Sequence, residues 1–205
     1  NFAYIICRFC ISLITPIIEV KMNFMELLLR RESCRSFSDK SVSREDLMKI
    51  VEAGRLSPSG CNSQPWKFIV VDEAEPKELL CDAMVTKNNL TGAPWRKQVP
   101  AFIMVVEQPA KVMSAVIETY HDSQRFAQGD IGMAALNICY AATELGLSCC
   151  MVGLFDQQKL EKYFHIPDSQ PVRLIIALGY NATSGAAARP KVRKDLAEVC
   201  SFNRW

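Results

Sequence analysis

Three polar clusters in this sequence carry residues whose types and spacing could bind a charged ligand. In the first, RRESCRSF, residues Arg31, Ser33 and Arg35 alternate, and alternate side chains of an extended segment lie on one face. Two guanidinium groups around a hydroxyl make a suitable clamp for a phosphate group. Arginines at the end of a helix can also simply complement the helix dipole, and for this cluster taken alone that explanation is favoured.

The second cluster is a polar loop, SPSGCNSQPWKF, between an expected helix and an expected strand. Ser59, Asn62 and Gln64 supply hydroxyl and amide groups there. Such groups can hydrogen-bond the edge of a heteroaromatic ring or a polyol chain. An ordinary polar turn that ends at a packed Trp66 would explain the same residues.

The third cluster is the basic run RPKVRK near the C-terminal end, which contains Lys191 and Arg193. By itself such a run is typical of a solvated tail. A function for it therefore depends on its combination with the other two clusters.

The composition excludes several classes of function. The 205 residues suit one domain of ordinary size, and a hydrophobic content of 49% is enough for a core. The formal net charge of +2 gives no field that would favour nucleic acid or an anionic membrane. Metal binding has no support, because the two histidines, His121 and His165, are far in sequence from the CxxC motif of Cys7 and Cys10.

Nine cysteines, scattered along a chain of this length, indicate free thiols rather than a disulfide framework. Cys149 and Cys150 lie in an apolar run and are expected to be core residues of a strand. Free thiols are typical of a reducing compartment, so the protein is predicted to be cytoplasmic.

Residues 1–21 form an apolar segment of a different kind. Arg8 and Pro16 interrupt it, so it falls short of the ~20 apolar residues that a membrane-spanning helix needs. It also lacks a basic region followed by a small-residue cleavage site. We expect a leader, translated from upstream or introduced by cloning, ahead of a start at Met22 or Met25. An extension that packs on a partner subunit is the alternative, and a membrane anchor is the least favoured.

Hydrophobic periodicity predicts the elements that must hold these clusters in place. One helix is clearly marked at its start, because Ser43 to Asp46 matches a capping box. Another, from Asp130, is apolar almost all round, which predicts burial in the fold or at an interface, and Gly146 marks its end. The expected helices are 24–31, 43–56, 76–85, 112–127, 130–146 and 157–164, and the expected strands are 67–72, 101–107, 149–154 and 172–180.

Interleaved helices and strands of this kind predict an α/β or α+β sheet wrapped by helices. No glycine-rich turn joins a first strand to a helix. The sequence therefore contains neither a dinucleotide-binding fingerprint nor a P-loop, and a nucleotide-like cofactor would have to bind in another way.

Taken together, the order and spacing of the clusters resemble the FMN-dependent nitroreductase family. The matching pieces, from about Met25 to Trp205, are RRESCRSF, the capped helix, LSPSGCNSQPWKFIVV, the apolar helix from Asp130, MVGLFD, and RPKVRKDLAEV with the final FNRW. The resemblance implies an α+β fold with a mostly antiparallel central sheet flanked by helices. It also implies an intertwined homodimer with FMN at the interface, with residues 22–205 as the FMN-binding domain.

The resemblance also implies roles for individual residues. Arg31, Ser33 and Arg35 match positions at the FMN phosphate and ribityl chain, and the basic tail adds positive charge at the phosphate. The polar loop would bound the isoalloxazine ring, in the same subunit or in the partner. The cofactor-binding residues that follow from the resemblance are Arg31, Ser33, Arg35, Ser59, Asn62, Gln64, Gly153, Leu154, Lys191 and Arg193.

In MVGLFD the family presents backbone N–H groups to the N5 and O4 edge of the flavin, which here points to Gly153 and Leu154. Fixed backbone donors stabilise the electron density that reduction places on the ring system. Leu154 replaces a small residue that is common in the family at this position. Arg96 or Lys97, ahead of the second strand, is a further candidate contact.

The activity implied by the resemblance is hydride transfer from NAD(P)H, through N5 of FMN, to a nitroaromatic, a quinone or a similar acceptor by a ping-pong mechanism. No catalytic side chain and no metal ligand is expected, because the flavin carries the chemistry. Tyr120 and Phe126 are candidate walls of the acceptor pocket, and core packing would explain them equally well. A slow flavin-binding protein for storage or redox sensing is the alternative function. The natural acceptor and the choice between NADH and NADPH stay open.

Overall fold

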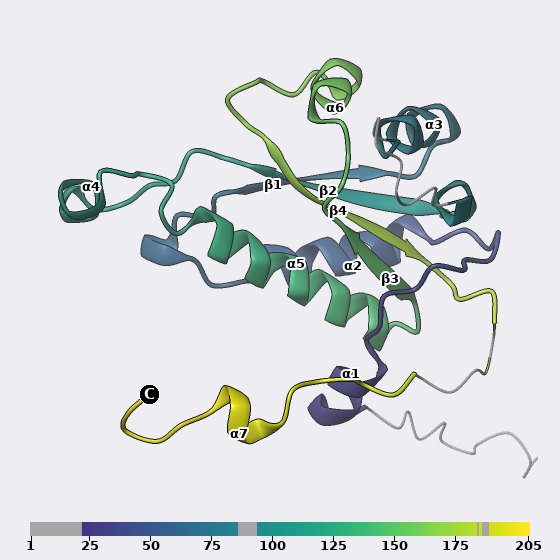
Figure 1. Cartoon of the computed structure of the whole chain (residues 1–205). Helices are drawn as coiled ribbons and strands as arrows, with labels where there is room; N and C mark the ends of the chain where they lie inside the picture. Colours follow the sequence, from purple (N-terminus) through teal and green to yellow (C-terminus); the bar gives the residue numbers. More distant parts are fainter. Residues whose placement is uncertain (1–21, 86–93, 184, 186–188) are drawn as a thin grey trace, which may run out of the picture.

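The computed structural model describes residues 22–85, 94–183, 185 and 189–205, and it places one sheet between two layers of helices (Figure 1). The strands are β1 (Trp66–Val71), β2 (Ala101–Glu107), β3 (Ser148–Val152) and β4 (Val172–Gly179), and the helices are α1 (Phe24–Arg30), α2 (Arg44–Arg55), α3 (Ala74–Ala83), α4 (Ser114–Tyr120), α5 (Ala127–Glu144), α6 (Gln157–Phe164) and α7 (Leu196–Val199). The strand order is β1-β2-β4-β3, and every neighbouring pair is antiparallel. Helices α2 and α5 cover one face of the sheet and α3 and α6 the other (Figure 1). This architecture confirms the predicted α+β fold with an antiparallel sheet flanked by helices.

The two central strands are buried on both faces, which explains their continuous apolar sequences. In β2, Phe102 and Met104 belong to the core cluster on the α3 and α6 side, whereas Ile103 and Val105 belong to the cluster on the α2 and α5 side. Each buried side chain of this size contributes roughly 1.5–3 kcal/mol to folding. The sheet is therefore held by two hydrophobic clusters, one on each of its faces.

Helix α2 begins at the predicted residue. The Ser43 hydroxyl accepts a hydrogen bond from the Asp46 N–H at 3.1 Å and caps the helix. The same hydroxyl donates to the Asp46 carboxylate at 2.8 Å. The two side chains therefore pair with each other and do not form the reciprocal capping box that the sequence predicts.

Helix α5 ends at the glycine that the sequence predicts. Gly146 has a φ of 77°, in the left-handed region that glycine adopts without strain. Its N–H donates to the Thr143 carbonyl at 3.1 Å, and the Leu147 N–H donates to the Ala142 carbonyl at 2.8 Å. These two bonds form a Schellman motif, which ends the helix and directs the chain into β3.

The segment that follows α1 runs along the free edge of β3. Ser33 pairs with Cys149 in a parallel bridge, and the Cys34 N–H donates to the Cys149 carbonyl at 2.9 Å. The segment is therefore extended, as the predicted alternation of clamp residues requires. Cys149 and its neighbour Cys150 are both buried, which confirms their prediction as core residues of a strand.

The predicted helix over 112–127 is wrong in its extent. The structure has only the short α4, followed by a break at His121, whose φ is 53°. Asp122 then accepts a hydrogen bond from the Gln124 N–H at 2.8 Å, and a local bond of this kind favours a turn over a helix. Helix α5 begins at Ala127, three residues earlier than predicted. The short α7 in the tail was not predicted.

The remaining predicted helices and strands agree with the structure to within two residues at each end. The predictions for residues 1–21, including the CxxC motif, and for most of the loop at 88–94 lie outside the described residues. In the part of the chain that the structure describes, no helix is long and apolar enough to span a membrane. The same part holds no group of His, Cys, Asp and Glu side chains arranged for a metal ion.

Candidate functional site

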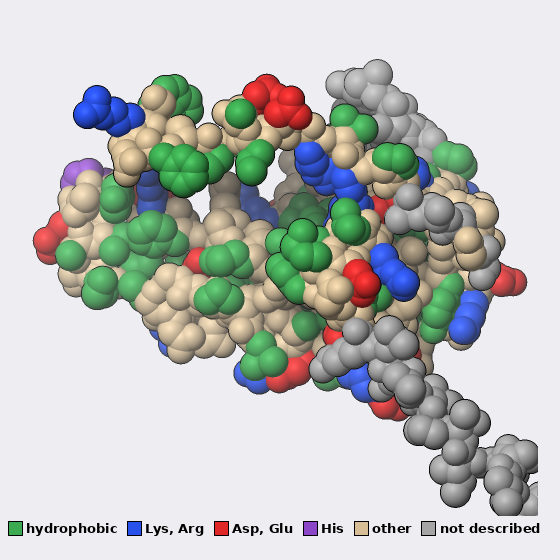
Figure 2. Space-filling model, turned by 90° about the horizontal axis from the view of Figure 1, so that it is seen from below, with side chains coloured by type: hydrophobic (Ala, Val, Ile, Leu, Met, Phe, Trp, Pro, Cys, Tyr) green, Lys and Arg blue, Asp and Glu red, His purple; other side chains and the backbone are tan. Residues whose placement is uncertain are grey.

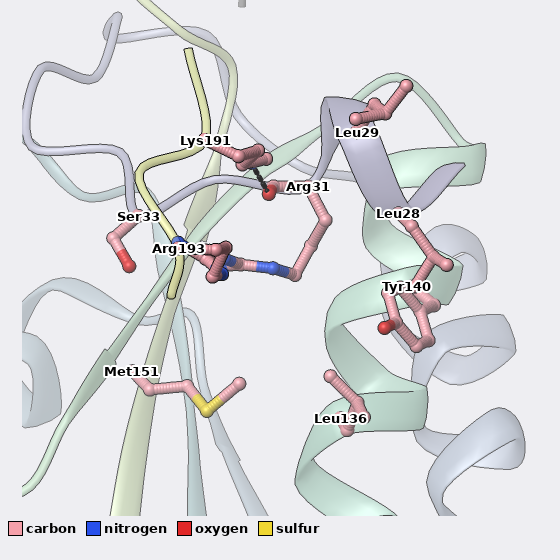
Figure 3. Close-up of a pocket in the computed structure, with 9 residues that line it drawn as sticks. All are labelled: Leu28, Leu29, Arg31, Ser33, Leu136, Tyr140, Met151, Lys191 and Arg193. Atoms are coloured by element: carbon pink, nitrogen blue, oxygen red, sulfur yellow. Dashed lines mark hydrogen bonds between the residues drawn. The ribbon is translucent and has the colours of Figure 1, made fainter. Parts of the chain in front are cut away.

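A cavity of about 550 Å³ lies where α1, α5, β3 and the C-terminal segment meet (Figure 3). Two of the predicted clusters meet there: Arg31 and Ser33 come from the segment after α1, and Lys191 and Arg193 come from the tail. Among the described residues, no Asp or Glu lines the cavity. The rest of its wall is formed by apolar and aromatic side chains, namely Leu28, Leu29, Leu136, Tyr140 and Met151.

Hydrogen bonds join the tail, residues 189–205, to the extended segment that follows α1. Lys191 donates through Nζ to the carbonyl oxygen of Arg31, and Arg189 donates through Nη2 to the carbonyl oxygen of Ser33 at 2.8 Å. Arg189 also pairs with Glu32, with Nε and Oε2 3.0 Å apart. Partial burial opposes ionisation of Glu32, but the hydrogen bonds and charge of Arg189 lower its pKa below the usual value. The tail therefore runs alongside the extended segment and brings its basic residues to the cavity.

The cavity concentrates positive charge. Figure 3 shows the Arg31 side chain folded back, so that its guanidinium lies next to Arg193. Burial lowers the pKa of Lys191, and the charges of Arg31 and Arg193 lower it further, against a smaller opposite effect of Glu32. Cations that repel one another are stabilised by an anion among them, so the donor set suits a phosphate group.

Arg35, Gly153 and Leu154 do not line this cavity. Arg35 is exposed, two residues beyond Ser33 along the same edge. Gly153 and Leu154 follow the end of β3, just past Met151 in the cavity wall, and both are exposed. A Cβ added at Gly153 would meet nothing within 4 Å, so there is open space beside this turn. Contacts from these residues to a cofactor stay predictions.

The predicted polar loop folds into a tight, self-bonded turn. Ser59 Oγ accepts from the Gln64 N–H at 2.9 Å, and Gln64 Nε2 donates to Asn62 Oδ1 at 3.2 Å. Cys61, Asn62 and Gln64 have φ values of 55°, 52° and 49°, a region that costs non-glycine residues roughly 1 kcal/mol or more. Ser63 Oγ is buried without a hydrogen-bond partner among the described residues. Strain and an unpaired buried hydroxyl in one loop are typical of a ligand-binding segment.

The loop and the cavity lie against different parts of α5. The Gly60 N–H donates to both carboxylate oxygens of the buried Asp130, at 3.1 and 3.2 Å, near the start of the helix. Leu136 and Tyr140 line the cavity farther along the same helix. At 1.5 Å per residue, Asp130 and Tyr140 are about 15 Å apart along the helix axis. One chain therefore brings the two arginine-containing clusters together but does not bring its own loop into the cavity wall.

Residues 28–180 match the model of the Nitroreductase family. This chain belongs to the nitroreductase family. The match spans the sheet, α2, the polar loop and α5, and ends before Lys191 and Arg193.

Other nitroreductases are similar to this chain over most of its length. The oxygen-insensitive NADPH nitroreductase of Helicobacter pylori is 25% identical over 202 residues, which cover 86% of this chain and 95% of that protein. The crystal structure of a nitroreductase family protein from Clostridium difficile 630 has a TM-score of 0.76 at 27% identity, and covers 90% of this chain and 100% of its own. The FMN-dependent nitroreductase of Clostridium difficile R20291 has a TM-score of 0.66 at 25% identity, covering 87% of this chain and 98% of its own.

The candidates Arg96 and Lys97 lie away from the cavity described above. Both belong to the short 3-10 helix Pro94–Gln98, and they line a separate cavity of about 590 Å³ beside α3. Helix α3 covers the face of the sheet opposite to α5 (Figure 1). The structure therefore does not bring these two residues to the site that holds Arg31 and Ser33.

The candidate acceptor walls lie on an arm, residues 108–126, which carries α4 away from the sheet (Figure 1). The rings of Tyr120 and Phe126 meet edge to face, with their centroids 6.3 Å apart, and both side chains are partly exposed. A Cβ added at Gly60 would lie 3.4 Å from Phe126, so the arm contacts the polar loop. Core packing, the simpler explanation of these aromatic residues, does not fit their exposure.

Several residues in or around the candidate site were not predicted from the sequence. Arg189 stands in the basic run, but its bond to Ser33 depends on the path of the tail. Asp130 is the only acidic residue between Ala127 and Thr143 of α5, and a lone carboxylate in an apolar helix was a usable signal. Leu136 and Met151 carried no signal, because apolar cavity walls and core residues have the same composition.

Proposed function

We propose that this protein is an FMN-dependent oxidoreductase that transfers hydride from NAD(P)H to a nitroaromatic, a quinone or a similar oxidised acceptor. The observation that carries the proposal is the cavity where Arg31, Lys191 and Arg193 meet, with no carboxylate among its described lining residues. Two similar nitroreductases support the choice of cofactor and reductant, one named for FMN and the other for NADPH.

The residues of the cavity fit the phosphate end of FMN. Two guanidinium groups, an ammonium group and the Ser33 hydroxyl can together donate to all the oxygens of a phosphate. The volume of about 550 Å³ exceeds a phosphate and leaves space for more of the cofactor beside Leu136 and Met151. Arg35 adds a further guanidinium to this edge of the sheet in the proposed complex.

When bound, FMN supplies two-electron redox chemistry, so that the nicotinamide and the acceptor can use one site in turn by a ping-pong mechanism. The chain supplies binding and orientation. In the proposed complex Ser59, Asn62 and Gln64 hydrogen-bond the polar edge of the ring system. The backbone N–H groups of Gly153 and Leu154 stabilise negative charge there without having to reorganise.

A homodimer would bring the polar loop of one protomer to the cavity of the other. Within one chain the loop is bound near the start of α5, and the cavity lies against the later turns of that helix. On α5, Met133 and Leu136 are partly exposed, and on α1, Phe24 and Leu29 are more than half exposed. Apolar side chains in such numbers on one side of a protein favour association with a partner.

The C-terminal segment supports the same dimer. Leu196, Val199, Phe202 and Trp205 are all more than 60% exposed. In Figure 2 the C-terminal segment runs across the molecule, with open gaps between it and the rest of the protein. Burying these four side chains on a second copy would recover roughly 1.5–3 kcal/mol for each fully covered one. An intertwined homodimer, with the C-terminal segment on the partner, accounts for apolar side chains that their own chain leaves uncovered.

The proposal also includes a cytoplasmic location and one FMN-binding domain over residues 22–205. The seven described cysteines are all free, which suits a reducing compartment. The helices and strands share two core clusters on a single sheet, which suits one domain.

The test is the visible absorption spectrum of the purified protein, before and after anaerobic addition of NADH and then NADPH. We expect a bound-flavin spectrum that bleaches with one or both nucleotides and returns when a quinone or a nitroaromatic is added. A bound flavin that no nicotinamide reduces would favour the alternative of storage or redox sensing. A colourless protein that also takes up no added FMN would contradict the cofactor assignment.

A further inference from the structure

We propose that Asp130 is a positioning residue, which fixes the polar loop against α5 and thereby sets how the loop meets the flavin. The inference rests on the proposed function, because the loop acts on FMN only if FMN is the cofactor. Asp130 itself does not line the cavity of Arg31 and Lys191, and it would act through Gly60, whose N–H it binds.

The first support is the burial of Asp130 and its choice of partner. The residue is only 5% exposed, and both of its carboxylate oxygens accept from the Gly60 N–H, at 3.1 and 3.2 Å. Among the described residues, no Lys, Arg or His forms an ion pair with it. A buried carboxyl group needs a hydrogen-bond partner to offset the cost of its burial, and the Gly60 N–H is such a partner. Both oxygens of Asp130 are therefore directed at the loop.

The second support is the strain that begins one residue after this bond. Cys61, Asn62 and Gln64 all have φ values between 49° and 55°. Conformations of this kind persist only where the surroundings hold them in place. Without the Asp130 bond, the loop could relax toward ordinary backbone angles, and the side chains of Asn62 and Gln64 would turn with it.

The third support is a second anchor on the same face of α5. Asn137 Nδ2 donates to Ser57 Oγ at 2.7 Å, and Ser57 is only 6% exposed. Asp130 and Asn137 are seven residues apart, which is close to two helical turns, so one helix face binds the loop twice. The same helix lines the cavity through Leu136 and Tyr140. Helix α5 thus holds the loop of its own chain at two points, Gly60 and Ser57.

The experiment compares FMN binding by wild type, Asp130→Ala and Asp130→Asn, using the full chain. Dissociation constants come from titration with FMN, and the visible circular dichroism of the bound flavin reports its surroundings. Hydrogen exchange of the Gly60 amide in flavin-free protein reports the anchor directly. The matched control is Thr143→Val on the same helix, where a buried hydroxyl donates to the Cys139 carbonyl at 2.8 Å, away from the loop.

We expect Asp130→Ala to raise the FMN dissociation constant roughly tenfold or more, since it removes a hydrogen bond to a charged group. It should also change the visible circular dichroism and speed exchange at Gly60. Asp130→Asn keeps the shape and one acceptor oxygen, so it should fold and give smaller changes in the same direction. Thr143→Val should lower the melting temperature without changing FMN affinity or the flavin signal.

Two outcomes would overturn the inference, and they can be told apart. A wild-type protein that binds FMN, with Asp130 variants that match it in affinity and circular dichroism, would overturn the role of Asp130 alone. A wild-type protein that takes up no FMN would overturn the proposed function, and the inference with it. If Asp130→Ala does not fold, Asp130→Asn supplies the test. A weaker affinity for FMN in that variant would support the role of Asp130, and an unchanged affinity and circular dichroism would overturn it.

Discussion

At the scale of single residues, Arg31, Lys191 and Arg193 bring three positive charges to one cavity. Among them, Lys191 is the group whose charge changes with pH in an accessible range, because burial and the two arginines lower its pKa below 10.5. A lowered lysine pKa means that the folded, flavin-free protein binds fewer protons than the unfolded chain at pH values just below 10.5. Its stability should therefore rise with pH in that window, as Lys191 loses its charge. Anion binding has the opposite requirement, since it favours the charged amine.

FMN affinity should accordingly fall as the pH rises into the window below 10.5, and Lys191→Met should flatten that fall. Titrations from about pH 7.5 to about pH 10 would measure both profiles, in a range where the phosphate stays fully ionised. Lys194→Met is the matched control, because Lys194 is exposed, belongs to the same basic run and does not line the cavity. Identical pH profiles for wild type and Lys191→Met would contradict the assignment of this lysine to the phosphate.

At the scale of elements, the contact of α2 with α5 depends on a glycine. A Cβ added at Gly54 would lie 2.8 Å from Ile138 Cγ1 and 3.1 Å from Phe68 Cζ, inside a closed core. Gly54→Ala gains about 1 kcal/mol in helix propensity but loses about 1–3 kcal/mol through overpacking. We expect a net destabilisation of about 1 kcal/mol in urea unfolding, because the Ile138 side chain has no free space to enter.

A double variant tests the reason for that loss. Ile138→Val removes the terminal methyl group, which would lie 2.9 Å from the new Cβ, so the two substitutions should couple. Gly54→Ala should cost less in the Ile138→Val background than in wild type. A stabilising Gly54→Ala in wild type would show that the core yields more easily than its packing indicates.

The base of the arm that carries α4 is closed by one glutamine. Gln124 Oε1 accepts from the Ala110 N–H at 2.6 Å, and its Nε2 donates to Glu107 Oε1 at 2.7 Å and to the Gln108 carbonyl at 3.1 Å. One side chain thus joins the two ends of residues 108–126. The rest of the arm is largely exposed, so its fixed position depends on this junction.

Gln124→Ala should loosen the arm and leave the sheet intact. Limited proteolysis should cut residues 109–123 several times faster, with only about 1–2 kcal/mol lost in overall stability, because the backbone groups left unpaired can reach water. Gln128→Ala makes the same substitution at an exposed glutamine of α5 and should leave the cleavage rate unchanged. Equal cleavage of the two variants would mean that Gln124 does not hold the arm.

Sequence patterns predicted the elements that have strong local signals. The Ser43 cap, the Gly146 end and the β-branched strands are decided by residues close to one another in the chain, and each is found where it was predicted. The arm was predicted as one helix because its apolar spacing is helical, whereas the bonds of Gln124 across its base are set by tertiary structure.

The candidate site, too, was predictable in its residue types but not in its long-range contacts. The basic and polar clusters were visible as residue types, and the structure brings Arg31, Ser33, Lys191 and Arg193 into one cavity. The placement of Arg35 outside that cavity, and the anchoring of the loop by Asp130, depend on where distant segments meet. The spacing of residues along the chain does not predict contacts between segments that are far apart in the sequence.

At the scale of the whole molecule, the proposed site needs two copies of the chain. The protein should sediment at twice its 23.0 kDa mass. Phe202→Asp combined with Trp205→Asp should weaken the dimer and lower FMN retention, because two charges would enter an apolar contact. Arg204→Asp changes an exposed charge in the same segment and serves as the control. A wild-type protein that sediments as a monomer at micromolar concentration would contradict the dimer.

The central claim is that this nitroreductase family member binds FMN by its phosphate in the cavity of Arg31, Lys191 and Arg193. The most direct test compares the affinities for FMN and for riboflavin, which lacks the phosphate, in wild type and in Arg31→Gln. Arg30→Gln is the matched control, since Arg30 is exposed on the last turn of α1 and does not line the cavity. The account predicts that wild type and Arg30→Gln prefer FMN strongly, and that Arg31→Gln loses roughly 10- to 100-fold of that preference. Equal affinities for FMN and riboflavin in wild type, or an undiminished preference in Arg31→Gln, would contradict it.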